Sequence, residues 1–71
     1  MKIIRLNPKH HQIKWWYGYL EEGETNITLH RENGPAWVWK KGPGDWYWHG
    51  ELIEHIYSQK QFEKWLKLSN F

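Results

Sequence analysis

The sequence predicts a small α+β domain in which a small antiparallel sheet of consecutive hairpins is capped by one short C-terminal α-helix. Aromatic and β-branched residues flank a glycine- and proline-containing turn at residues 40–45, a pattern typical of a hairpin. A second aromatic run covers residues 12–17, and the hydrophobic period becomes helical after residue 57. We expect aromatic hairpin repeats over about residues 12–57 and a helix over about 58–68, within a single domain of residues 1–71.

The first strands are expected near the N-terminus. Residues 12–17 read as a strand, in which Trp15 and Tyr17 face opposite to Trp16 because side chains alternate along a strand. Residues 1–6 are a short candidate partner that ends at the Asn7-Pro8 pair.

The central hairpin is expected to gather its indole rings on one side. If the turn closes symmetrically, Trp39 pairs with Trp46 and Trp37 pairs with Trp48. The two-residue period of a strand then places all four rings on the same face. The residues between them take the other face.

The C-terminal segment carries helix signals. Ser58 is a candidate N-cap, and Gln61 occupies the position of a capping-box partner. Phe62, Trp65 and Leu66 then form one apolar stripe with helical spacing. A helix of about three turns packed on the sheet follows.

The core has to be built from aromatic side chains. A domain of this length buries only about 60% of the surface of its unfolded chain, and the sequence has no cysteine for a disulfide. Seven tryptophans among 71 residues supply the missing volume. The aromatic side chains expected in the core are Trp15, Trp37, Trp39, Trp46, Trp48, Phe62 and Trp65.

Two stretches carry a family resemblance. Residues 29–36 (LHRENGPA), followed by an aromatic strand and by residues 46–52 (WYWHGEL), resemble a repeat of small phage and phage-derived bacterial proteins that is similar to MORN-type hairpin repeats. Residues 14–20 also align with residues 45–52 as an internal repeat, each stretch an aromatic strand that runs into a glycine. The resemblance implies a hairpin-repeat fold with a short final helix and a viral origin, and it implies no shared activity. The turn at 40–44 is longer than in the family, and Val38 stands where the family is commonly polar.

The location predicted from the sequence is cytoplasmic, which is the host cytoplasm if the protein is viral. The absence of cysteine fits a reducing compartment. Residues 1–5 are too short an apolar run for a signal peptide or a membrane span. The net charge is only +2, but residues 1–20 carry four basic residues without an acid, whereas residues 21–32 are mostly acidic, so a dipolar surface is an alternative to a plainly solvated one.

The motifs predict no enzyme, no cofactor and no metal site. The five histidines lack the spacing of a chelating pair, and the adjacent His10 and His11 would point to opposite faces of a strand. Ser58 has no nucleophile-elbow context. The loop at 41–44 lacks phosphate-loop spacing, and its Pro43 removes an amide donor.

Three functions remain. The first is a non-enzymatic phage-type accessory module that binds and inhibits or redirects a host protein. The second is a binder that sequesters a nucleotide-like signalling ligand between aromatic rings, for which a homo-oligomer would provide depth. The third is single-stranded nucleic-acid binding, which needs a continuous basic groove. The candidate ligand- or partner-binding residues are Trp16, Tyr19, His30, Arg31, Val38, Lys40, Lys41 and Tyr47. For His30 and Arg31 a structural role beside a turn at Asn33-Gly34 is the alternative.

Overall fold

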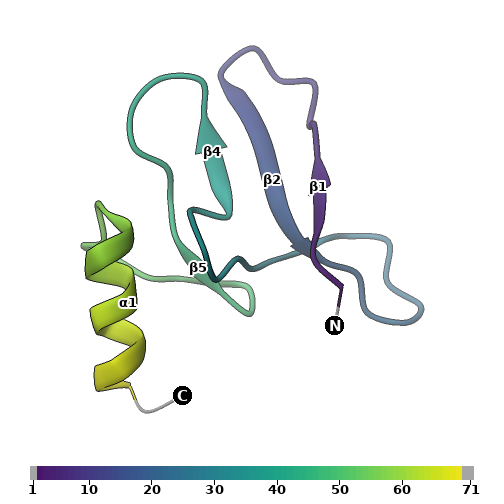
Figure 1. Cartoon of the computed structure of the whole chain (residues 1–71). Helices are drawn as coiled ribbons and strands as arrows, with labels where there is room; N and C mark the ends of the chain where they lie inside the picture. Colours follow the sequence, from purple (N-terminus) through teal and green to yellow (C-terminus); the bar gives the residue numbers. More distant parts are fainter. Residues whose placement is uncertain (1, 70–71) are drawn as a thin grey trace.

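The computed structural model describes residues 2–69 and confirms an α+β fold of short antiparallel strands followed by one helix (Figure 1). Met1, with which the first strand was expected to begin, lies outside the described residues. The elements are β1 (Ile4–Leu6), β2 (Ile13–Tyr19), β3 (Thr28–Leu29), β4 (Trp37–Trp39), β5 (Tyr47–Trp48), β6 (Glu51–Leu52) and α1 (Gln59–Leu68).

Strand β2 is the centre of a four-stranded sheet. The predicted partner β1 pairs with it along one side, while β4 and β3 pair with the first and second halves of its other side. Gly18 makes the pairing with β3 possible, because a Cβ atom there would lie 2.1 Å from the carbonyl oxygen of Thr28. This close backbone approach explains a glycine inside an aromatic strand.

The central hairpin differs from the predicted one in its register. Trp37 is bridged to Asp45, not to Trp48, and Trp39 pairs with Ile13 of β2, not with Trp46. The side chain of Asp45 explains the shift, because its Oδ2 accepts a hydrogen bond from Trp39 Nε1 at 2.9 Å. The chain then leaves β4 and enters a second hairpin.

This second hairpin joins β5 to β6 through a two-residue turn at His49 and Gly50. Both residues have positive φ angles, 48° and 86°, as a type I′ turn requires. The internal repeat predicted from the sequence does not give two equivalent units, because Gly50 lies in this turn whereas Gly18 lies within β2.

The helix begins and ends as predicted. The Oγ atom of the N-cap Ser58 accepts a hydrogen bond from the backbone N–H of Gln61, and Gln61 Oε1 accepts one from the N–H of Tyr57. Gln61 thus closes the capping box one residue earlier than its usual form. The helix buries Phe62 completely against Trp46 and Ile53.

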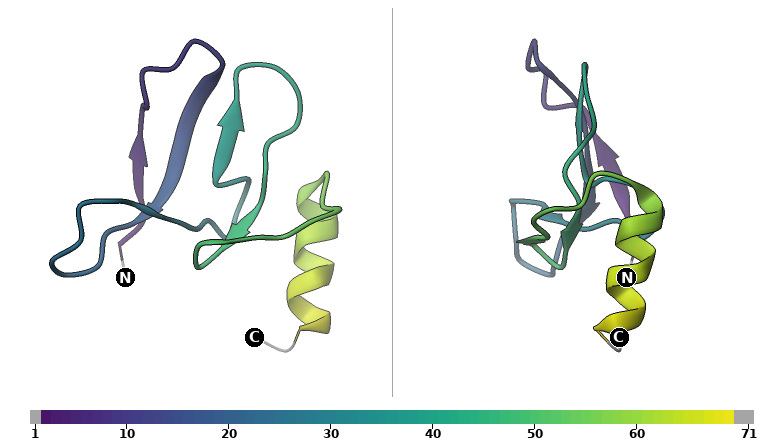
Figure 2. Two further views of the ribbon diagram at one scale, coloured as in Figure 1. Left: turned by 180° about the vertical axis from the view of Figure 1, so that it is seen from behind. Right: turned by 90° about the vertical axis from the view of Figure 1, so that its left-hand side faces the viewer.

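The core therefore lies beside the four-stranded sheet and not on it. In Figures 1 and 2 the helix stands next to β5, at the far side of the molecule from β1 and β2. The molecule is a slab with extents of 32 × 31 × 16 Å. Its accessible surface is 5492 Å², whereas about 4,800 Å² is usual for a monomer of this mass. Within residues 2–69, no second layer lies over either face of the sheet.

Candidate interaction surface

One face of the sheet is formed by apolar side chains from four strands. Leu6, Trp16 and Trp37 lie in one row of directly paired residues, and Ile4 and Leu29 flank Gly18 in the next row. Directly opposite residues of neighbouring strands share a face, and Trp39 joins them because it lies two positions after Trp37. We call this surface the uncharged face. Its six side chains are Ile4, Leu6, Trp16, Leu29, Trp37 and Trp39.

The three indole rings of the uncharged face form a continuous row. The ring centroids of Trp16 and Trp37 are 5.2 Å apart, and those of Trp37 and Trp39 are 5.4 Å apart. The Nε1 atoms of Trp16 and Trp37 are buried, and among the described residues they have no acceptor. An unpaired buried donor costs about 1–3 kcal/mol.

A hollow of about 290 Å³ lies at one end of this row. Leu6, Trp16 and Leu29 of the uncharged face line it together with residues 25–27. Leu6 is 39% exposed. The lining of the hollow is mostly apolar, so the hollow can receive an apolar side chain of a partner.

The opposite face carries two arginines that cover aromatic rings. The Cζ atom of Arg5 lies 4.1 Å from the ring centroid of Trp15, and that of Arg31 lies 3.8 Å from the ring centroid of Tyr17. Both distances fit cation–π contacts. We call this surface the guanidinium face; Val38, which is paired with Trp15, belongs to it.

Arg31 is held by more than the ring of Tyr17. Its Nε donates to Asn33 Oδ1 at 3.1 Å and its Nη1 to the carbonyl oxygen of Pro35 at 3.2 Å. A Cβ atom at Gly34 would lie 2.8 Å from the Arg31 Cζ, so a side chain at this position would displace the guanidinium. These contacts favour a structural role for Arg31 beside the Asn33-Gly34 turn over a role in ligand binding.

His30 is also structural, which corrects its place among the candidate binding residues. Its side chain is 1% exposed, so it offers a ligand no surface. Its Nδ1 accepts a hydrogen bond from the backbone N–H of His49 at 3.0 Å, and its ring stacks on that of His49. Burial lowers the pKa of His30, and the charge of His49 acts in the same direction against a smaller opposing effect of Glu32. His30 thus holds the β5–β6 turn against β3 as a neutral imidazole.

The predicted binding residues do not form one patch. Trp16 lies with Trp37 and Trp39 and not with Val38, since Trp16 pairs directly with Trp37. Tyr19 is half-buried, and its hydroxyl is 2.9 Å from His49 Nδ1. Tyr47 is half-buried too, and its burial, followed by the charge of Asp45, raises the pKa of its hydroxyl.

The aromatic residues predicted for the core fall into two groups, one in the cluster around Phe62 and one on the sheet. Trp46 and Phe62 are buried, and Trp48 and Trp65 pack against them. Trp15, Trp37 and Trp39 are half-buried too, but they lie on the sheet and do not belong to the cluster around Phe62, so their assignment to that core was wrong. The prediction assumed that the helix covers the sheet, whereas it packs on the chain segment around Trp46 and Ile53.

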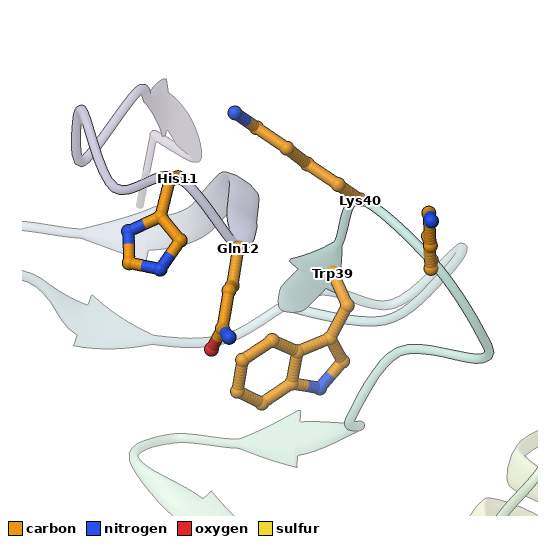
Figure 3. A pocket seen from close by; sticks show the side chains of 5 residues that line it. His11, Gln12, Trp39 and Lys40 are labelled. Carbon is orange, nitrogen blue, oxygen red and sulfur yellow. The ribbon is translucent and has the colours of Figure 1, made fainter.

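Lys40 and Lys41 lie at one end of the sheet and are exposed. Together with His11, Gln12 and Trp39 they line a hollow of about 460 Å³. The indole of Trp39 forms one side of this hollow, and His11 and Gln12 form another (Figure 3). Sequence reasoning did not identify Leu6, Leu29, His11 or Gln12. For this end the sequence indicated Lys40 and Lys41 as candidates and a run of basic residues before residue 15.

No family model matches the chain, and comparisons with curated proteins and with solved structures found no match. The phage-type repeat therefore remains a prediction from the sequence. In the part of the chain that the structure describes, no helix is both long and apolar enough to span a bilayer. Among the same residues, no three metal-ligating side chains are grouped to hold an ion.

Proposed function

We propose that this chain is a non-enzymatic binding module that docks a partner protein on its uncharged face. The observation that carries the proposal is a row of three half-buried indoles, bordered by Leu6 and Leu29, over which the described residues place no further layer. Exposed apolar patches of this kind mark interaction sites, and tryptophan is enriched at binding hot spots.

The surface area supports the same proposal. The chain exposes about 700 Å² more than a compact monomer of its mass. A protein–protein interface of standard size buries about 800 Å² on each partner. A partner that covered the uncharged face would bring the exposed surface close to the usual value.

The geometry also suggests what the partner presents. An apolar side chain would enter the hollow beside Trp16. The resemblance to phage repeat proteins makes a host protein the expected class of partner, which the module would inhibit or redirect.

A pair of matched variants tests the proposal. Leu6 and Leu52 are both leucines of short strands, 39% and 44% exposed, but only Leu6 belongs to the uncharged face. We expect Leu6→Glu to weaken the affinity for a partner, captured by cross-linking and then purified, by at least about tenfold, or 1.4 kcal/mol. Leu52→Glu should leave it unchanged. Equal affinities for both variants would refute docking on this face.

The structure offers a nucleotide-like ligand fewer binding groups than the sequence predicted. His30 is buried, and the Nε and Nη1 donors of Arg31 are occupied within the chain. Lys40 and Lys41 remain exposed beside the half-buried ring of Trp39. Any ligand of this class is therefore expected at the end of the sheet and not beside the Asn33-Gly34 turn.

A further inference from the structure

The charges of the chain are separated along the central strand. The loop before β2 and the loop after β4 lie together at one end of the sheet, and the loop after β2 lies at the other (Figure 1). The first end carries Lys9, Lys14, Lys40, Lys41 and the imidazoles of His10 and His11. The other end carries Glu21, Glu22 and Glu24. We call the first region the basic end.

The distance between the two ends makes them electrostatically independent. Strand β2 has seven residues and is about 20 Å long at about 3.3 Å per residue. The Debye length at 0.15 M ionic strength is about 8 Å. The net charge of +2 therefore understates the field at the basic end, where Asp45 contributes one negative charge beside Trp39.

The basic end has two hollows that share lining residues. The one shown in Figure 3 has a volume of about 460 Å³ and contains the ring of Trp39. The other has a volume of about 380 Å³, and Lys9, Lys14 and Trp15 are among its lining residues. His11 and Lys40 line both. Because Trp39 and Trp15 belong to opposite faces of the sheet, the hollows form a track across its end.

The track is held in shape by the chain itself. The backbone N–H of Lys40 donates to the carbonyl oxygen of Gln12 at 2.9 Å, which fastens the two loops together. The bond from Trp39 Nε1 to Asp45 Oδ2 fixes the orientation of one indole, and the Arg5 guanidinium covers the other at Trp15. The rings of Trp39 and Trp15 are thus preorganised, each in a hollow that Lys40 also lines.

From this arrangement we propose that the basic end binds a single strand of nucleic acid. Its phosphates would lie near Lys9, Lys14, Lys40 and Lys41, and bases would stack on the ring face of Trp39 and on the face of Trp15 that is turned away from Arg5. Proteins that bind single strands combine a positively charged groove with aromatic stacking platforms in this way. A duplex is the poorer ligand, because its bases are already stacked inside the helix. The strand site shares Trp39 with the uncharged face, but its lysines lie outside the surface proposed for docking a partner protein.

The test measures fluorescence anisotropy of a labelled oligothymidylate 12-mer with the full chain. The double variant Lys40→Gln/Lys41→Gln is compared with Lys60→Gln/Lys64→Gln, which removes the same charge from exposed positions of α1. We expect the first pair to weaken binding at least tenfold and the control pair to change it less than twofold. Equal weakening by both pairs, or no binding by the unmodified chain, would overturn the proposal.

Salt and ligand length separate a strand from other anions. Four lysines near phosphates predict a slope of about −3 for the logarithm of the binding constant against the logarithm of the salt concentration. Thymidine monophosphate and a 12-base-pair duplex should both bind at least tenfold more weakly than the 12-mer. A mononucleotide that binds as tightly as the 12-mer would assign the hollow to a free nucleotide, and a duplex that does so would leave the indoles without a role; either result refutes the proposal.

Discussion

The two faces of the four-stranded sheet carry similar aromatic side chains but differ in what lies over them. On the guanidinium face, Arg5 covers Trp15 and Arg31 covers Tyr17. On the uncharged face, the rings of Trp16, Trp37 and Trp39 contact one another and no cation covers them in the contacts described. The number of aromatic residues therefore does not identify a binding face. What identifies it is whether other strands of the same chain supply a group that covers the rings.

The largest expected effect comes from a change that disrupts both faces together. Gly18→Ala would force the Thr28 carbonyl away from β2, which separates Leu29 from the uncharged face and Arg31 from the guanidinium face. We expect a loss of about 3 kcal/mol in the free energy of unfolding, as for severe overpacking. Urea denaturation measures it. Gly23→Ala is the control, because its Cβ would meet no atom within 4 Å; its cost of about 1 kcal/mol comes from its φ of +83° alone. Equal losses would mean that the close approach at Gly18 is unimportant.

A smaller effect should separate the two arginines of the guanidinium face. Arg31→Ala removes a cation–π contact and two hydrogen bonds, which together are worth about 2 kcal/mol. Arg5→Ala removes a cation–π contact at an exposed side chain and should cost about 0.5–1 kcal/mol. The midpoints of chemical denaturation of the two variants should follow that order. If Arg31→Ala is harmless, the rings of this face do not need their covering groups and the contrast between the faces fails.

The smallest effect is a dependence of stability on pH. The pKa of His30 is lowered in the folded protein, so below its ordinary value of 6.5 the unfolded chain binds a proton that the folded chain does not. Stability is therefore complete above about pH 6.5 and decreases as the pH falls through 6.5 toward the folded pKa, by at most about 1.4 kcal/mol per pH unit. Thermal denaturation between pH 5 and 8 measures this.

Two histidine variants serve as controls for this measurement. His30→Asn, which keeps an acceptor for the His49 N–H, should flatten the pH profile. His10→Asn, at an exposed position, should leave the profile as it is. A slope that persists in His30→Asn would place the titrating group elsewhere.

Much of the fold could be predicted because its signals are local. The period of the apolar residues and the cap at Ser58 gave the helix to within one residue of its start. The Asn7-Pro8 pair separated two antiparallel strands as expected. These features depend on residues close together in the sequence.

The candidate site could not be predicted to the same extent, because it depends on register between distant strands. Alternation along β2 correctly places Trp15 and Trp16 on opposite faces of the sheet. It does not predict which residues of β4 lie on the same face as Trp16. The pairing of Trp16 with Trp37 decides that, and the register of β2 with β4 is irregular between Ile13 and Trp15, which no alternation pattern predicts. The basic end could be predicted only in part. The basic residues are evident in the sequence, but residues 9–14 come close to Lys40 and Lys41 only because β4 pairs with β2.

Strand β1 has one further consequence, for solubility. It is the outer strand of the sheet, and its free edge is only three residues long. Lys2 and Arg5 place charges along it and Pro8 follows shortly after, which are features that discourage edge-to-edge association. Two molecules could meet through their aromatic faces, but β1 is a poor template for adding strands, so the half-buried indoles do not lead to fibrillar aggregation.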